Sequence, residues 1–199
     1  MNLDLDKILN EVSSIARHIG GYLKNEQSKL KSSAIEMKGS RDYVSYVDKE
    51  AEKQLVERLK EVIPEAGYLT EEETVEQEVK EYMWIIDPLD GTSNYVHGVA
   101  PYAVSIALSY KEKIILGVVY DPLADELYSA IEGKRATLNG EFIDVSSKDE
   151  IKNSFIGFGI PYVVNKETES ILKNIWEHFG DASFRINGSA AVELCYVAC

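Results

Sequence analysis

An apolar run leads directly into two aspartates within residues 83–92, which read Met83-Trp84-Ile85-Ile86-Asp87-Pro88-Leu89-Asp90-Gly91-Thr92. Four consecutive large apolar side chains predict a buried strand. Pro88 fixes its own φ angle and cannot donate a hydrogen bond to a neighbouring strand, so it favours a bend after Asp87. We therefore expect Asp87 and Asp90 to lie on one short bend at the end of a strand, with the Leu89 carbonyl between them.

This bend offers the ligands of a magnesium site. Mg²⁺ prefers carboxylate, carbonyl and water oxygens, and the bend supplies the first two kinds. Residues 93–97 could open a helix turn, whose N–H groups would attract a phosphate. The alternative is a plain turn, in which an aspartate caps and Gly91 bends the chain. Because the strand, Pro88 and Gly91-Thr92 coincide, we favour the functional interpretation.

Two helices are predicted before the bend. Apolar residues recur at helical spacing over residues 3–30, and the pair Gly20-Gly21 weakens that helix locally. A short strand at 43–46 leads into a second helix from about Val47 to Val62, which Pro64 ends.

Strands dominate after the bend. Apolar runs bounded by the turn signals Asp121-Pro122 and Asn139-Gly140 predict strands at 103–108, 114–120, 127–130 and 136–138. Two helices followed by strands joined through tight turns indicate an α+β fold with a mainly antiparallel sheet.

A second, smaller unit follows. The pattern predicts a strand at 154–159, a helix at 167–179, a strand at 183–186 and an apolar helix at 188–199. We place a soft boundary near 147, which gives an N-terminal α+β domain at 1–147 with the metal site and a partial C-terminal α/β domain at 148–199. The last helix has no glycine cap and no basic last turn, so we expect this domain to be incomplete or covered by another chain.

Charge and composition limit the possible partners. The chain has 34 acidic and 21 basic residues and a formal charge of −13, which argues against nucleic acid as a partner. An enzyme for an anionic phosphate ester would then need bound cations to reverse the charge of its site. Two cysteines, the lack of a signal-like start and the lack of an apolar run of about 20 residues predict a cytoplasmic protein without a membrane partner.

The segment 84–98 resembles the inositol monophosphatase family. It reads Trp84-Ile85-Ile86-Asp87-Pro88-Leu89-Asp90-Gly91-Thr92-Ser93-Asn94-Tyr95-Val96-His97-Gly98. Other matching pieces follow the family order, and the resemblance spans essentially the whole chain: Lys38, residues 42–48, Glu71-Glu72 and residues 185–191. The ending Thr92–His97 favours inositol monophosphatases over the bisphosphate nucleotidases and fructose-1,6-bisphosphatases that share the motif.

The resemblance implies a layered αβαβα sugar-phosphatase-like fold, a homodimer, Mg²⁺ as cofactor and sensitivity to lithium. It implies that Glu71, Asp87 and the Leu89 carbonyl bind one Mg²⁺, that Asp87 and Asp90 bind a second, and that Glu71 contacts a third. The remaining implied roles concern water and substrate. Thr92 with Asp48 would activate the attacking water, and the N–H groups of Gly91 and Thr92 would hold the phosphate. Asp90 and the turn Gly188-Ser189-Ala190 would meet the alcohol part.

Several of these residues also have plain structural interpretations. Residues 71–73 could be a solvated acidic run, and Asp48 could cap the second helix. Ser189 could be the N-cap of an ordinary strand-to-helix turn, and Lys38 an ordinary loop lysine. Cys195 and Cys199 lie four residues apart on one helix face, where packing is a better explanation than metal binding.

Two departures from the family pattern matter. Thr70 stands where the family usually has glycine, so the following loop could differ. The family also carries a Trp-Asp motif beyond residue 199, whose aspartate completes the second metal site. If these 199 residues are the whole polypeptide, we therefore expect weakened metal binding and poor or absent turnover.

The sequence thus predicts Mg²⁺-dependent hydrolysis of a small phosphate monoester, with inositol monophosphate as the first choice. The alternatives are a 3′(2′),5′-bisphosphate nucleotidase, a fructose-1,6-bisphosphatase, or a truncated, non-catalytic protein that binds cations or a partner.

Overall fold

The computed structural model describes residues 3–29, 35–37, 43–147, 150, 154–159, 165–179 and 182–199. Lys38 and Asp42, two residues of the family-like pattern, lie outside the described residues. No helix within these ranges is long and apolar enough to cross a membrane.

A seven-stranded sheet forms the centre of the fold, with the strand order β3-β4-β5-β6-β7-β8-β9. Only β3 and β4 run parallel, and every other neighbouring pair in this sheet is antiparallel. The predicted antiparallel sheet is therefore confirmed. Its strands are β3 (Gly67–Thr70), β4 (Tyr82–Asp90), β5 (Ala103–Tyr110), β6 (Lys113–Asp121), β7 (Glu126–Ile131), β8 (Thr137–Leu138) and β9 (Glu141–Phe142).

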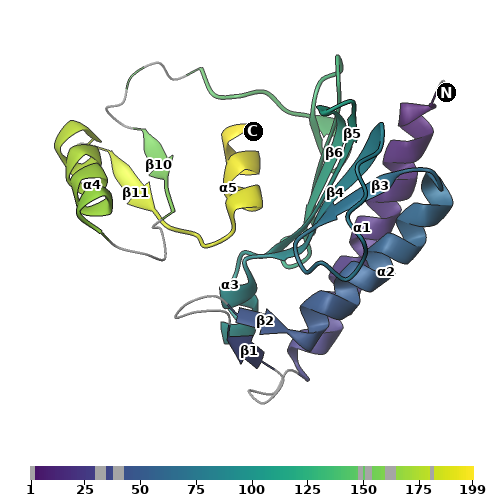
Figure 1. Ribbon diagram of the computed structural model, residues 1–199. Coiled ribbons are helices and arrows are strands. Elements are labelled where there is room, and N and C mark those ends of the chain that lie inside the picture. Colours follow the sequence, from purple (N-terminus) through teal and green to yellow (C-terminus); the bar gives the residue numbers. More distant parts are fainter. Residues whose placement is uncertain are drawn as a thin grey trace.

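Two long helices, α1 (Leu5–Gln27) and α2 (Tyr46–Val62), cover one face of this sheet (Figure 1). Their buried residues recur every three or four positions, as the sequence predicts. They pack on alternate residues of the central strands, among them the fully buried Trp84. Gly20, in the weak spot of α1, has a packing reason, because a Cβ there would lie 2.5 Å from the ring of Tyr120.

The predicted bend after Asp87 is a bulge inside β4, not a turn at its end. The pairing of β4 with β5 shifts between Asp87 and Asp90 and resumes at Asp90, which pairs with Ala103. This bulge re-aims side chains while the strand stays in the sheet. Gly91 then takes a φ of 91°, and the short helix α3 (Thr92–His97) begins. A residue with a side chain would be strained at that angle.

Helix α3 is fixed to the helical layer by Tyr95. The Tyr95 side chain is buried, and its hydroxyl donates a hydrogen bond of 2.8 Å to the Leu23 carbonyl in α1. Its ring meets the ring of Tyr102 edge to face at 5.0 Å. The segment after the bulge therefore has a defined position relative to the core. Near it lies a two-stranded antiparallel pair, β1 (Ile35–Met37) and β2 (Tyr43–Ser45).

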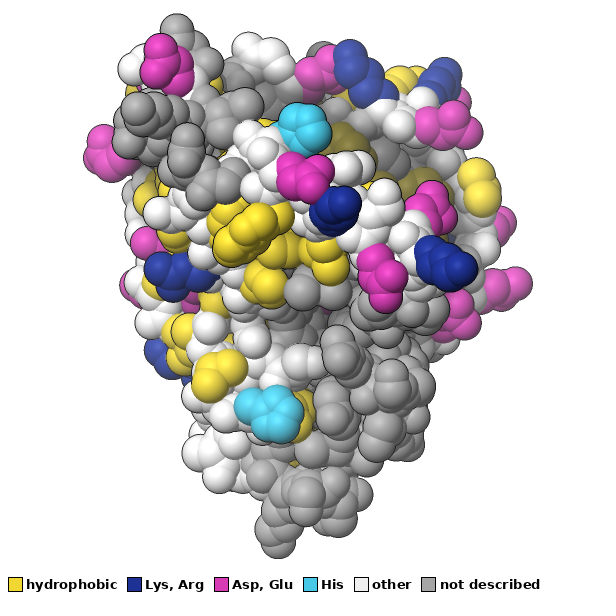
Figure 2. All heavy atoms as spheres, turned by 90° about the vertical axis from the view of Figure 1, so that its left-hand side faces the viewer, with side chains coloured by type: hydrophobic (Ala, Val, Ile, Leu, Met, Phe, Trp, Pro, Cys, Tyr) yellow, Lys and Arg dark blue, Asp and Glu magenta, His cyan; other side chains and the backbone are white. Residues whose placement is uncertain are grey.

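The C-terminal unit has the predicted mixed α/β character. Its two strands, β10 (Phe155–Gly157) and β11 (Ser183–Arg185), pair in parallel and are connected through α4 (Lys166–Phe179). The face seen in Figure 2, which is the left-hand side of Figure 1, carries a group of exposed apolar side chains. The large exposed apolar residues of the C-terminal unit include Phe155, Ile171 and Trp176. The last helix, α5 (Ala190–Val197), contacts β5 and β6 on the face opposite α1 and α2 (Figure 1).

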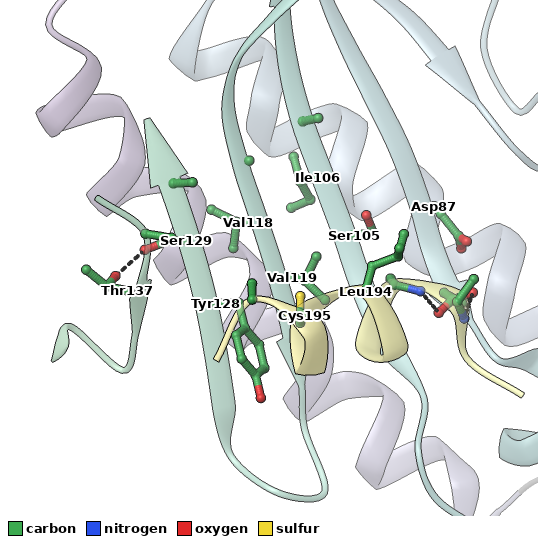
Figure 3. Close-up of a pocket in the computed structure, with 18 of the residues that line it drawn as sticks. Asp87, Ser105, Ile106, Val118, Val119, Tyr128, Ser129, Thr137, Leu194 and Cys195 are labelled. Atoms are coloured by element: carbon green, nitrogen blue, oxygen red, sulfur yellow. Dashed lines mark hydrogen bonds between the residues drawn. The ribbon is translucent and has the colours of Figure 1, made fainter. Parts of the chain in front are cut away.

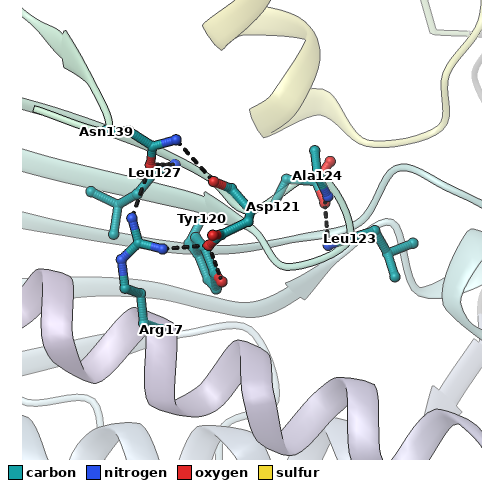
Figure 4. Close-up of polar contacts among 8 residues, drawn as sticks. Arg17, Tyr120, Asp121, Leu123, Ala124, Leu127 and Asn139 are labelled. Carbon is teal, nitrogen blue, oxygen red and sulfur yellow. Dashed lines mark hydrogen bonds and ion pairs between the residues drawn. The ribbon is translucent and has the colours of Figure 1, made fainter. Parts of the chain in front are cut away.

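A polar cluster connects α1 to the turns at one end of the sheet (Figure 4). Arg17 donates hydrogen bonds to Asp125 at 2.5 Å and to the Asn139 side-chain oxygen at 2.9 Å. Asn139 also accepts from the Leu127 N–H at 3.0 Å and donates to the Asp125 carbonyl at 2.9 Å. One amide side chain thus connects the two turns and the helix.

Asn139 gives a test of this cluster, because it combines three hydrogen bonds with a left-handed φ of 49°. We expect Asn139→Ala to lower the free energy of unfolding by about 1–3 kcal/mol, since the turn loses its bonds and keeps a strained backbone. Asn139→Gly should cost about 1 kcal/mol less, because glycine accepts that angle. Urea unfolding of both variants measures this, and equal losses would contradict the backbone contribution.

Candidate active site

Four carboxylates from three separate segments meet beside the β4 bulge. In the parallel pair, Thr70 of β3 lies opposite Ile86 of β4, so the next residues, Glu71 and Asp87, emerge at the same edge of the sheet. Asp48 comes from the first turn of α2 and is only 1% exposed. Asp87 experiences the charges of Glu71, Asp90 and Asp48. The structure therefore brings together the four acidic residues that the family resemblance assigns to the site.

The crowding changes the acidity of these groups. Burial raises the pKa of Asp87 well above its usual range, and Glu71 and Asp90 raise it further. Burial also raises the pKa of Asp48, and the nearby Glu72 and Glu71 add to this effect. Both shifts mean that the negative forms are disfavoured unless positive charge comes close. Perturbed carboxylates in one cluster are a common property of reaction sites.

Thr92 joins Asp48 to the bulge. Its hydroxyl lies 3.0 Å from the Leu89 carbonyl and 3.3 Å from a carboxylate oxygen of Asp48, and it can donate to either. Asp48 is not the cap of α2, because this helix already begins at Tyr46. One oxygen of its carboxylate faces the Thr92 hydroxyl. The two residues to which the resemblance assigns water activation are thus direct neighbours.

Asp87 and Asp90 have different partners. The carboxylate of Asp87 accepts a hydrogen bond of 3.0 Å from the Leu89 N–H, which fixes its orientation within the bulge. Asp90 accepts from the Ser189 hydroxyl and from the N–H groups of Ala191 at 2.9 Å and Ala190 at 3.3 Å. Asp90 thereby connects β4 to the first turn of α5.

The turn before α5 contributes the other predicted substrate residues. Ser189 is buried and is the N-cap of α5, as its plain structural interpretation predicts. Its hydroxyl therefore accepts from the Val192 N–H and also donates to Asp90. Gly188 has a φ of 79° and lies against Asn94 of α3. Asn94 donates hydrogen bonds to the Asn187 carbonyl at 2.6 Å and to the Pro101 carbonyl at 2.7 Å. The turn Gly188-Ser189-Ala190 is therefore held next to Gly91, Thr92 and Asp90.

Sequence reasoning missed two residues that shape the site. Asn94 is one, and its role depends on contacts with segments distant in the chain. The other is Glu52, which is fully buried on α2 and accepts hydrogen bonds from residues 72 and 74. A signal for Glu52 was available, because it follows Asp48 by four residues and so lies on the same face of the helix.

The available donors fit a hard cation. Carboxylate oxygens and the Leu89 carbonyl are ligands of the kind that Mg²⁺ prefers, and no cysteine or histidine is needed. Among the described residues, no three acidic, histidine or cysteine side chains stand in a ready-made metal geometry. Asp90 directs its carboxylate to α5, whereas Asp87 lies against Leu89 and Glu71.

An apolar cavity of about 490 Å³ opens beside these carboxylates (Figure 3). It lies between α5 and the face of β5, β6 and β7, and Asp87 and Asp90 belong to its lining. Leu194 and Cys195 of α5 close one side. Burial raises the pKa of the Cys195 thiol to about 12, which keeps it protonated and fits packing better than metal binding.

The sequence model of the inositol monophosphatase family matches residues 4–199. This chain belongs to the inositol monophosphatase family. It is 39% identical over 192 residues to the fructose-1,6-bisphosphatase/inositol-1-monophosphatase of Aquifex aeolicus, covering 94% of this chain and 72% of that protein. It is 37% identical over 193 residues to the Nus factor SuhB of Vibrio cholerae, covering 96% and 72%.

Solved structures of the family have the same fold. The extragenic suppressor protein suhB of Bartonella henselae superposes with a TM-score of 0.89 at 32% identity, covering 96% of this chain and 74% of that one. Membership makes the chain a phosphatase-type hydrolase of a generally metal-dependent family that acts on small phosphate esters. The predicted fold class and family are confirmed.

Proposed function

We propose that this chain hydrolyses a small phosphate monoester with the help of Mg²⁺, and that inositol monophosphate is the preferred substrate class. The observation that carries the proposal is the contact between Thr92 and Asp48, placed directly beside Asp87 and the Leu89 carbonyl. A hydroxyl joined to a buried carboxylate can orient a water and pass on its proton. Phosphate esters need such a water, delivered in line with the leaving oxygen.

The residues divide the work by position. Thr92 accepts a hydrogen bond from the attacking water while its own hydroxyl donates to Asp48. As the water oxygen bonds to phosphorus and the bond from phosphorus to the leaving oxygen breaks, Asp48 takes up the water's proton through Thr92, and the leaving oxygen gains a proton from solvent. When Mg²⁺ is bound, Glu71, Asp87, the Leu89 carbonyl and Asp90 would hold it, and it would supply positive charge for the water and the leaving oxygen. This assignment is supported by the donor set and by the raised pKa of Asp87 in the crowded site.

The substrate is proposed to lie between the bulge and the turn before α5. The N–H groups of Gly91 and Thr92 would bind phosphate oxygens, because they lie at the start of α3, where backbone N–H groups lack helical partners. Asp90 and the turn Gly188-Ser189-Ala190 would contact the alcohol. The hydrogen bonds of Asp90 to this turn support the assignment.

Two other functions have some support. The Aquifex relative is named for fructose-1,6-bisphosphatase as well as inositol-1-monophosphatase, which favours a sugar bisphosphate as the second substrate class. Several relatives are named Nus factor SuhB, which keeps a partner-binding role for this chain as an alternative. The 3′(2′),5′-bisphosphate nucleotidase alternative rests on the shared motif alone.

Other features stay predictions. Lithium sensitivity and the homodimer rest on the family resemblance, and the cytoplasmic location rests on cysteine usage and the start of the sequence. The absence of nucleic-acid binding rests on the formal charge of −13.

A phosphate-release panel tests the proposed reaction. We expect the full-length protein to release phosphate from inositol monophosphates only with Mg²⁺, and Li⁺ to suppress the release. Faster release from fructose 1,6-bisphosphate or from a 3′,5′-bisphosphate nucleotide would replace the substrate class. The absence of release from every ester would refute the enzymatic proposal and favour the partner-binding alternative.

Substitutions at Thr92 test the proposed water activation. Thr92→Val keeps the shape of the side chain but removes the hydroxyl, so we expect kcat to fall by about 10²–10⁴-fold. Thr92→Ser keeps the hydroxyl and should retain most of the activity. Thr137→Val makes the same change on β8, where the hydroxyl pairs with Ser129, and serves as the control. Comparable activity of Thr92→Val and Thr137→Val would exclude the role proposed for Thr92.

A further inference from the structure

The loop that carries Glu71 is held by a buried carboxylate on α2. Glu52 is 0% exposed and accepts three hydrogen bonds from residues 72–74. One oxygen accepts from the Glu72 N–H at 2.7 Å. The other accepts from the Thr74 N–H at 2.8 Å and from the Thr74 hydroxyl at 2.6 Å. Such short hydrogen bonds to a charged acceptor are roughly twice as strong as neutral ones.

This loop needs an external anchor. Residues 71–81 contain no helix or strand before β4 begins, so the backbone lacks regular ladder partners there. Glu73 adopts a φ of 52°, which is a strained backbone angle for a residue other than glycine. A second contact, from the Gln77 side chain to the Thr70 carbonyl at 3.1 Å, lies on the other side of Glu71. Glu71 is therefore flanked by two fixed points.

The position of Glu71 follows from these two points. Thr70 is fixed in β3 by its pairing with Ile86, and the next peptide N–H after Glu71 is fixed by Glu52. The Glu71 backbone thus has little freedom between them, and its side chain is directed toward Asp87. We propose that Glu52 is a positioning residue, which fixes residues 71–74 so that the Glu71 carboxylate is available to a divalent cation together with Asp87.

The inference rests on the proposed function, because it concerns the cation-binding carboxylates of that same site. It also gives α2 two separate tasks. Asp48 and Glu52 lie one helical turn apart on the buried face of the helix. Asp48 meets Thr92, whereas Glu52 meets the Glu71 loop. Burial destabilises a carboxylate, and the three hydrogen bonds that Glu52 accepts offset this penalty.

Glu52→Gln is the decisive variant, because it keeps the size of the side chain. A glutamine has one acceptor oxygen and one NH₂ group, so at least one loop donor would face another donor. We expect the Glu72 and Thr74 amide protons to exchange with solvent at least about tenfold faster. The affinity for Mn²⁺, measured directly by electron paramagnetic resonance, should fall about 10–100-fold, as is typical when an outer hydrogen-bond partner of a metal ligand is lost. At saturating Mg²⁺, kcat should recover to within a few-fold.

Two further variants make the test sharp. Glu57→Gln makes the same change at an exposed position of α2 and should alter neither exchange nor Mn²⁺ affinity. Thr74→Val removes only the hydrogen bond from the Thr74 hydroxyl to Glu52. It should speed amide exchange and lower the Mn²⁺ affinity by smaller factors than Glu52→Gln. If Glu52→Gln does not fold, Thr74→Val tests the inference in its place.

The outcomes separate this inference from the proposed function. Faster exchange with unchanged Mn²⁺ affinity would reduce Glu52 to a structural residue and overturn the inference, and so would unchanged exchange. Phosphate release by the unaltered protein is measured alongside. If that protein is inactive but the variants still lose Mn²⁺ affinity, the positioning role stands and the proposed reaction fails.

Discussion

Repulsion between clustered carboxylates is the constraint on which this structure depends. Asp48 is buried and Asp87 is partly buried, whereas Glu71 is exposed. Burial raises the pKa values of Asp48 and Asp87, the neighbouring Glu71 raises both further, and these effects oppose folding. The fold tolerates them because each group is held by an element that is stabilised elsewhere. Helix α2 and strand β4 are fixed by the large apolar core, and the parallel pairing of β3 with β4 places Glu71 beside Asp87. The negative charge of this cluster is what the proposed cation would neutralise.

The same carboxylates also organise their surroundings. Asp90 joins the sheet to the first turn of α5, and Asn94 joins α3 to the turn that precedes it. Binding of a cation or substrate at the bulge would therefore act on both the sheet and α5. The segment after Asp87 is thus also one of the contacts between the sheet and the turn before α5.

Much of the fold could be predicted from the sequence, because its helices, strands and turns depend on local patterns of apolar and turn-forming residues. The stripes of α1 and α2, the strand before Asp87 and the turn at Asn139-Gly140 follow from burial and backbone preference. The strand β3 was not predicted, since four residues carry too weak a pattern, and the bend at Pro88 is a bulge because β5 pairs on both sides of it. The spacing from Asp48 places Glu52 on the same helix face, but its hydrogen-bond partners, about twenty residues away, could not be assigned from that spacing. The pairing of Asp48 with Thr92 was reached only through the family resemblance.

The most direct test of the central claim compares thermal unfolding of the unaltered protein and Asp87→Asn, with Mg²⁺ and with a chelator. Asparagine can still accept the Leu89 N–H, so only the charge is lost. If the crowded carboxylates bind cations, then with the chelator present Asp87→Asn unfolds at a higher temperature than the unaltered protein. Mg²⁺ then raises the midpoint of the unaltered protein and leaves that of the variant nearly unchanged. A variant that is less stable in the chelator, or an unaltered protein that does not respond to Mg²⁺, would contradict the account.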